Sequence, residues 1–112
     1  MQKNICVIEG DGIGPEVMAQ AIKVLNKVAL KFNHKFDYQY CLAGGCAIDK
    51  TGKCLPDETL NAVLNTDSTL LGAVGGSKWD SEPANNRPEK ALLGIRKAMQ
   101  VYANLRPQKL YA

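Results

Sequence analysis

The fold is decided at residues 4–16, where the chain reads NICVIEGDGIGPE. The unbroken apolar run from Ile5 to Ile8 has the length and composition of a buried strand. A turn with three glycines follows, and Pro15 then stands where a helix start tolerates its missing N–H. Glu16 suits the positive end of that helix. The segment therefore predicts a strand, a tight turn and a helix in direct succession.

The rest of the chain repeats this alternation. Apolar residues recur at helical spacing to about residue 32, and alternate with polar residues over 36–42 as in a half-exposed strand. We expect an irregular or short helical segment at 45–55, helices at 56–65 and 89–101, strands at 68–74 and 102–111, and a long polar loop at 77–88. In the helix at 56–65, Leu60, Val63 and Leu64 are expected to face inward. This order predicts an α/β fold with an open, mostly parallel sheet flanked by helices.

Composition limits the function classes. A chain of 112 residues forms one domain at most, and its net charge of +3 is spread along the sequence, which gives no support for a nucleic-acid or membrane partner. No apolar stretch approaches the ~20 residues that span a bilayer, and no secretory signal is recognisable at Met1. A cytoplasmic location is the expectation.

The four cysteines, Cys6, Cys41, Cys46 and Cys54, are predicted to be free, partly buried thiols. A disulfide framework is typical of secreted domains, which this sequence does not resemble. A zinc site that also uses His34 is the third alternative. The spacings of four and seven residues between the last three cysteines differ from those of structural zinc knuckles.

The glycine turn has the spacing G-x-G-x-G, and Pro15 stands at the sixth position. A dinucleotide-binding turn needs G-x-G-x-x-G, so an ordinary phosphate-binding loop is disfavoured. A tight turn that requires positive φ is the competing structural interpretation.

A second candidate site is the stretch VGGSKWD at residues 74–80, which follows a predicted strand. Ligands of open α/β sheets gather at the carboxyl ends of strands, and paired glycines allow a flat ligand to approach the backbone. A flexible connection without function would have the same composition.

The third candidate is RPEKALLGIR at 87–96 together with YANLRP at 102–107. Glu89, Leu92, Leu93 and Arg96 share one face of a helix by their spacing. Arginine binds carboxylates with a planar fork, and the leucines could receive a hydrocarbon tail. The alternative is a solvated helix face on which glutamate and arginine pair.

These three motifs together resemble the N-terminal part of the isocitrate/isopropylmalate dehydrogenase family, and within it the 3-isopropylmalate dehydrogenases. The resemblance covers essentially all 112 residues. It implies an NAD-dependent, metal-dependent decarboxylating dehydrogenase of leucine biosynthesis that acts on 3-isopropylmalate as a homodimer. Glu9, in place of a common proline, and Asn85-Asn86, in place of more basic residues, are the departures from the family pattern.

The resemblance also implies roles for particular residues. Arg96 and Arg106 would hold the malate carboxylates, Leu92 and Leu93 would line the pocket for the isopropyl group, and Glu89 would lie between that group and the nicotinamide. A glutamate and two leucines would disfavour the extra carboxylate of isocitrate; tartrate and homoisocitrate are less favoured alternatives. The residues expected to line the cofactor site are Ile13, Gly75, Gly76, Ser77, Lys78, Asp80 and Glu89.

The chain lacks the catalytic and metal-binding residues that the resemblance implies. In the family a lysine and a tyrosine move protons and aspartates hold Mg²⁺ or Mn²⁺; Lys78 and Tyr102 do not match those positions. We therefore expect residues 1–101 to be part of the first, cofactor-side domain and 102–112 to be a strand that crosses into a second domain. The chain alone is expected to be inactive. The alternative is a stand-alone α/β module that binds an acidic ligand or partner without catalysis.

Overall fold

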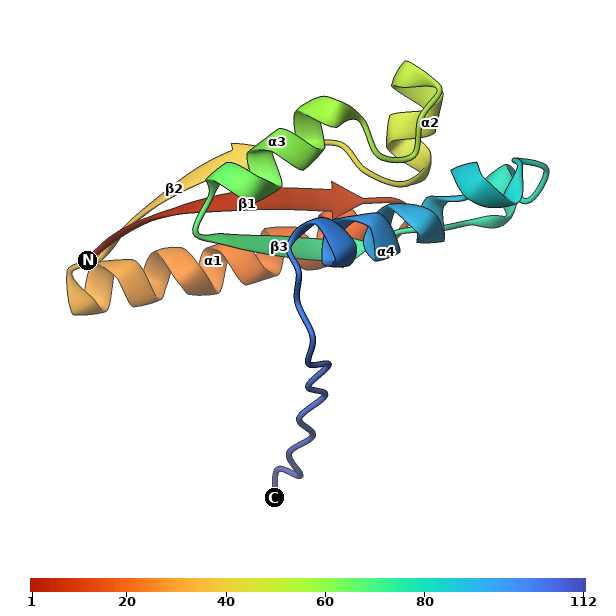
Figure 1. Cartoon of the computed structure of the whole chain (residues 1–112). Coiled ribbons are helices and arrows are strands. Elements are labelled where there is room, and N and C mark those ends of the chain that lie inside the picture. Colours follow the sequence, from red (N-terminus) through yellow and green to blue (C-terminus); the bar gives the residue numbers. More distant parts are fainter.

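Three parallel strands form the centre of the chain in a computed structural model, which describes residues 1–112 (Figure 1). They are β1 (Gln2–Gly10), β2 (Lys35–Tyr40) and β3 (Ser68–Ala73), in the order β2-β1-β3. Both neighbours of β1 run parallel to it, and Ile5 lies opposite Tyr38 on one side and Ser68 on the other. The predicted α/β class and parallel sheet are confirmed.

Helices cover both faces of this sheet. The first, α1 (Gly14–Phe32), lies on one face, and α2 (Gly45–Thr51), α3 (Asp57–Asn65) and α4 (Pro88–Ala98) lie on the other (Figure 1). The predicted polar loop contains two short 3-10 turns at Ser77–Trp79 and Ala84–Asn86. The helix that follows this loop ends at Ala98, three residues before the predicted end.

Strand β1 divides the core into two layers because its side chains alternate between the faces. Ile5 and Val7 pack with Met18 of α1, whereas Cys6 and Ile8 pack with buried residues of α2, α3 and α4. Burial of β1 on both faces explains its unbroken apolar run. In α3, Val63 is 2% exposed, as predicted, but Leu64 is 56% exposed, so its predicted inward orientation is wrong.

One flank of α1 is apolar and open to solvent. Val17, Val24 and Val28 lie seven and four residues apart and are 49%, 63% and 37% exposed. Asn26, on the opposite flank, accepts a hydrogen bond from Tyr38 of β2, so the valine flank faces the β3 side. On that side the outer edge of β3 has no neighbouring strand. Two unsatisfied features, an apolar helix flank and a free sheet edge, therefore lie on the same side of the molecule.

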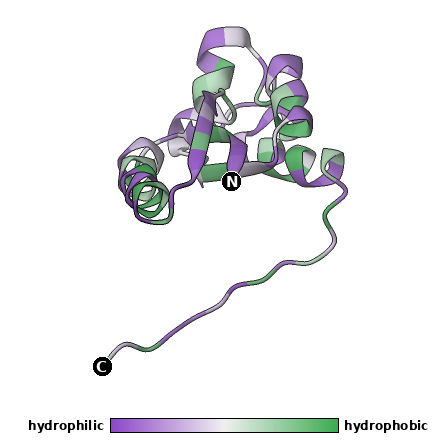
Figure 2. Cartoon of the chain, turned by 90° about the vertical axis from the view of Figure 1, so that its left-hand side faces the viewer, coloured by the Kyte–Doolittle hydropathy of each residue, from purple (hydrophilic) through white to green (hydrophobic).

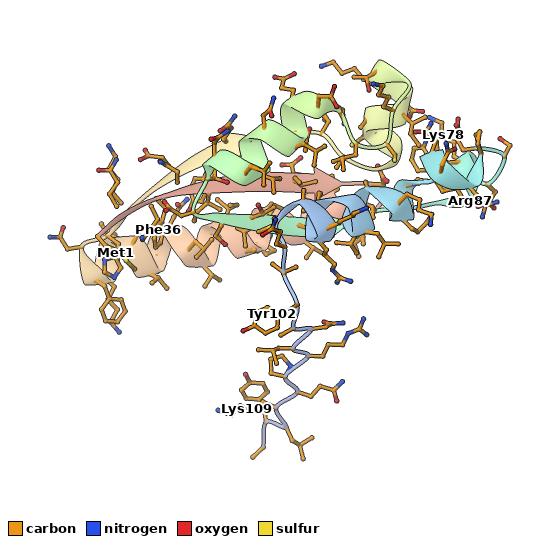
Figure 3. The ribbon with its side chains drawn as sticks, in the orientation of Figure 1. Met1, Phe36, Lys78, Arg87, Tyr102 and Lys109 are labelled. Carbon is orange, nitrogen blue, oxygen red and sulfur yellow. The ribbon has the colours of Figure 1, made fainter.

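The segment from Tyr102 to Ala112 extends away from the body of the molecule, and all of its residues are exposed (Figures 2 and 3). It makes no strand, and Tyr102 is 99% exposed. The predicted strand at 102–111 is not formed, because a strand requires a hydrogen-bonded neighbour and none of the 112 residues supplies one. Whether this segment crosses into a second domain stays a prediction.

No helix of the chain is both long enough and apolar enough to cross a membrane.

Candidate functional site

The first two candidate motifs and the start of the third, at Glu89, meet at one end of the molecule, beyond the carboxyl ends of β1 and β3 (Figure 1). Close backbone packing brings them together. A methyl group on Gly10 would lie 1.8 Å from the carbonyl oxygen of Ala73, and one on Gly72 would lie 2.4 Å from that of Glu9. Gly10 also has φ +82°. The glycine turn is therefore needed first for packing against β3 and for positive φ, which supports the structural interpretation of this motif.

Asp11, at the centre of this turn, is only 5% exposed and binds three backbone N–H groups from two other segments. Its Oδ2 accepts hydrogen bonds from Gly45 at 2.7 Å and from Gly75 at 2.9 Å. Its Oδ1 accepts one from Cys46 at 2.7 Å. Its own N–H donates to the carbonyl of Ala73 at 2.7 Å.

This arrangement determines which ligand the turn can bind. Gly45 begins α2, and backbone N–H groups at a helix start are suitable donors for a phosphate. Here the carboxylate of Asp11 already occupies them. A pyrophosphate would meet a buried acidic group instead of free donors. A ligand at this edge must therefore lie outside the turn, on the side where Ile13 is 62% exposed.

Gly75 and Glu89, two of the predicted cofactor-side residues, are brought into contact. Gly75 has φ +115°, and a methyl group placed on it would lie 3.0 Å from Oε1 of Glu89. Any larger residue would thus meet both backbone strain and the carboxylate. Glu89 stands in the first turn of α4, where the helix dipole favours a negative charge, and forms no ion pair.

The start of the loop after β3 is held against α2. Asp49 accepts hydrogen bonds from Nζ of Lys78 at 2.7 Å and from Nε1 of Trp79 at 3.0 Å. These bonds, led by the one from Lys78, lower the pKa of Asp49. The indole of Trp79 covers Gly45 so closely that a methyl group there would lie 2.3 Å from two ring carbons. Lys78, predicted to be a cofactor neighbour, is in this structure paired with a carboxylate.

The end of the same loop is also fixed to the body. Asn86 accepts a hydrogen bond from the N–H of Cys54 at 2.9 Å and donates to the carbonyl of Gly52 at 3.0 Å. Arg87 donates to the carbonyl of Asp80 at 2.9 Å (Figure 3). Asp80 and Ser77 are exposed. The family departure at Asn86 thus bears on loop structure, because this side chain holds the loop in place.

The third motif presents its predicted face to solvent. Ala91 and Ile95 bury the opposite side of α4, being 0% and 4% exposed. Leu92 is half-buried and Leu93 is 53% exposed, and Glu89 and Arg96 are exposed. No ion pair involves this face, so the alternative of a salt-bridged helix surface is not supported.

Arg96 also lines a shallow hollow of about 370 Å³ whose other wall is residues 101–105. Arg106 follows this wall on the exposed final segment and makes no hydrogen bond or ion pair. The two arginines predicted to hold one substrate are therefore not brought together in this structure.

The four cysteines are free thiols, as predicted. Burial raises the pKa of Cys6 to about 12, with Cys41 beside it as the second cause. Burial also raises the pKa of Cys46, next to Asp11, and of Cys54. Protonated thiols at neutral pH are poor nucleophiles and poor metal ligands. No three His, Cys, Asp or Glu side chains gather as a metal site would require.

The sequence did not predict two parts of the site, which are the hydrogen bonds of Asp11 and the contact of Asp49 with Trp79. Asp11 stands between two glycines, where a turn residue was the simplest interpretation. Only the long-range pairing of β1 with β3 places Gly75 beside it. The position of Asp11, directly after β1 and within a glycine turn, was the one available signal.

The fold defines a doubly wound α/β unit whose candidate binding residues Gly75 and Glu89 lie beyond the carboxyl ends of its strands. The chain matches the family described as isocitrate/isopropylmalate dehydrogenase over residues 4–112. It belongs to that family.

Relatives and solved structures agree with this assignment. The chain is 57% identical over 110 residues to 3-isopropylmalate dehydrogenase of Helicobacter hepaticus, and 54% identical over 111 residues to that of Bacillus subtilis. These matches cover 98% and 99% of this chain but 31% and 30% of those relatives, so the chain spans about a third of their length. The crystal structure of a beta-decarboxylating dehydrogenase from Thermococcus kodakarensis, in its apo form, matches 88% of this chain and 27% of that one, with TM-score 0.70 and 28% identity.

Proposed function

We propose that this chain is the N-terminal segment of an NAD-dependent 3-isopropylmalate dehydrogenase, the oxidative decarboxylation step of leucine biosynthesis. Family membership supports the reaction type. The observation that carries the substrate is the solvent-facing side of α4, on which an unpaired carboxylate, two leucines and an unpaired guanidinium follow one another. Along α4, these side chains extend from the neighbourhood of Gly75, at the proposed cofactor side, to the hollow beside Arg96.

In this proposal each residue of the face has a distinct task. The Arg96 guanidinium donates two parallel hydrogen bonds to one malate carboxylate, and Arg106 is expected to bind the other when the final segment folds over the site. Leu92 and Leu93 remove the isopropyl group from water. Glu89, held over Gly75, lies beside the nicotinamide ring.

The same face gives a reason for substrate choice. Isocitrate would place a third carboxylate where the isopropyl group lies. That carboxylate would lose its hydration against two leucines and would meet the negative charge of Glu89. The site is therefore proposed to prefer isopropylmalate through both an attractive apolar surface and a repulsive charge.

The remaining groups of the reaction are assigned to parts of the parent protein beyond these 112 residues. NAD accepts the hydride, and a divalent cation, Mg²⁺ or Mn²⁺, supports the loss of carbon dioxide. No set of residues in this chain suits that cation. We propose that the parent enzyme is a cytoplasmic homodimer and that the 112-residue chain alone forms no NADH.

A chimera tests the proposal. Residues 1–112 replace the matching segment of the Helicobacter hepaticus relative, and NADH formation is measured with 3-isopropylmalate and with isocitrate. We expect activity with the first substrate only. Arg96→Ala should lower kcat/KM by about 100-fold or more, since it removes two hydrogen bonds to a charged group that contribute about 1.5–3 kcal/mol each. Lys97→Ala, at the exposed neighbouring position, is the matched control. A folded chimera that is inactive, or full activity of the Arg96 variant, would contradict the assignment.

The second candidate is a stand-alone module that binds an acidic ligand through Arg96 without catalysis. It is favoured because no three His, Cys, Asp or Glu side chains among the 112 residues form a cluster that could hold a metal ion. It predicts that the bare chain binds 3-isopropylmalate in calorimetry as tightly as the chimera does, and that the chimera is inactive.

A further inference from the structure

We propose that Asp11 is a positioning residue that sets the geometry of the proposed cofactor-side residues by holding three separate backbone segments at one buried carboxylate. This inference deepens the proposed function and rests on it where NAD is concerned. Its structural part does not depend on which ligand binds.

Asp11 is 5% exposed, and a carboxylate removed from water is costly unless it is hydrogen-bonded. No lysine or arginine forms an ion pair with it. Its compensation comes from the N–H groups of Gly45, Cys46 and Gly75. Hydrogen bonds that involve a charged acceptor are short and strong, so these contacts specify the geometry tightly.

The three donors belong to segments that are far apart in sequence. Asp11 follows β1, Gly45 and Cys46 begin α2, and Gly75 follows β3. Helix α2 has seven residues and no side-chain cap of its own, and the chain after Ala73 leaves the sheet ladder. The carboxylate thus connects the turn that carries Ile13 with the strand end that contacts Glu89.

Gly75 connects the hydrogen bonds of Asp11 with the proposed cofactor site. Its N–H donates to Asp11, and its Cα faces the carboxylate of Glu89. Rotation of this peptide would change the distance between Glu89 and the turn that holds Ile13. In the proposed function these two residues border the nicotinamide and adenine ends of the same cofactor. Asp11 therefore acts on cofactor binding through Gly75 without touching the cofactor.

The split of the bonds between the two oxygens gives a specific test. Oδ2 accepts two bonds and Oδ1 accepts one. In Asp11→Asn the amide oxygen is expected to take the Oδ2 position, because this keeps the bonds from Gly45 and Gly75. The NH₂ group then faces the N–H of Cys46. In Asp11→Ala all three bonds are lost.

Amide hydrogen exchange by NMR, on the 112-residue chain, separates these outcomes. We expect Asp11→Asn to accelerate exchange at Cys46 alone, and Asp11→Ala to accelerate it at Gly75 as well, by about 10-fold or more. The matched control is Asp67→Ala. Asp67 accepts the N–H of Asn4 at 2.8 Å at the opposite end of β1, so its loss should affect that amide and leave Gly75 unchanged. The amide of Val7 in β1, 0% exposed, reports global unfolding in every variant.

Two results would overturn the positioning role: unchanged exchange at Gly75 in Asp11→Ala, or equal acceleration at Gly75 and Val7, which would mean a general loss of stability. If Asp11→Ala does not fold, the asparagine variant decides, because the proposal requires a selective effect at Cys46. In the chimera, Asp11→Ala should raise the KM for NAD by about 10-fold or more. The change in kcat should be smaller than the change in KM. A positive exchange result with an unchanged KM would reject the cofactor role, and an inactive wild-type chimera would reject the proposed function instead.

Discussion

Gly45→Ala is predicted to destabilise the chain, although alanine normally stabilises a helix relative to glycine by about 1 kcal/mol. Gly45 is the first residue of α2, and its conformation is open to any residue. The added methyl carbon would, however, lie 2.3 Å from Cε2 and Cζ2 of Trp79. Carbon atoms require about 3.5 Å, so the indole must move away by more than about 1 Å.

The magnitude follows from what that movement breaks. Overpacking at a close contact costs about 1–3 kcal/mol. Displacement of the ring also breaks the bond from its Nε1 to Asp49, which contributes about 1 kcal/mol at an exposed position. After the gain in helix propensity, we expect Gly45→Ala to lower the free energy of unfolding by about 2 kcal/mol.

The assay uses Trp79 itself, because it is the only tryptophan in the chain. Urea unfolding followed by circular dichroism gives the free energy, and the native emission maximum reports whether the indole has moved into solvent. Gly94→Ala in α4 is the control. There the nearest atom is the terminal methyl of Leu55, at 2.7 Å, which can rotate away. A Gly45→Ala variant with unchanged emission and equal or greater stability would refute the packing argument.

Three further predictions concern pH, the loop and the turn. Burial raises the folded-state pKa of Cys6 from 9.0 to about 12, so the free energy of unfolding should be constant below pH 9 and fall as pH rises above it. Urea midpoints measured between pH 7 and 10.5 should show this decrease. Cys6→Ala should make the decrease smaller. The hydrogen bond from Lys78 lowers the pKa of Asp49 below 3.8, so the contribution of Asp49 to stability is present above that pH and is lost as pH falls further. Asp49→Ala should shift Trp79 emission to the red but leave the urea midpoint nearly unchanged, because exposed ion pairs contribute little. Gly10→Ala should prevent folding, because its methyl group would meet a backbone carbonyl, whereas Gly12→Ala, with φ +54° and open space, should cost about 1 kcal/mol by circular dichroism.

The sequence predicted those elements whose cause is local. The apolar run of β1, Pro15 at the start of α1 and the glycines after each strand act within a few residues, and each predicted element inside 1–101 is present. Features that depend on distant segments could not be predicted. The contact of Asp11 with Gly75 spans 64 residues and exists only because β3 pairs with β1. The contact between Trp79 and Asp49 likewise depends on where α2 packs.

The other differences concern surfaces that no other part of this chain covers. Apolar residues at helical spacing in α1 include Val17 and Val24, which face away from the sheet. Periodicity identifies the residues that a helix can bury and leaves open what covers them. The final segment is a similar case, since its composition is compatible with a strand but the outer edge of β3 has accepted no partner. The curated relatives are about three times as long as this chain, which covers 31% and 30% of their length.

The position of Arg106 predicts that the bare chain binds the proposed substrate, 3-isopropylmalate, weakly. To reach a ligand held by Arg96, the segment from Tyr102 to Arg106 must take up one fixed conformation over α4. Ordering a residue costs about 1–2 kcal/mol of backbone entropy, so these five positions cost on the order of 5–10 kcal/mol. A charged hydrogen bond returns only about 1.5–3 kcal/mol. Arg96 alone would then hold 3-isopropylmalate with a Kd in the millimolar range or weaker. Calorimetry on the 112-residue chain measures this directly: micromolar binding that depends on Arg106 would show that the segment closes over the site without the rest of the enzyme.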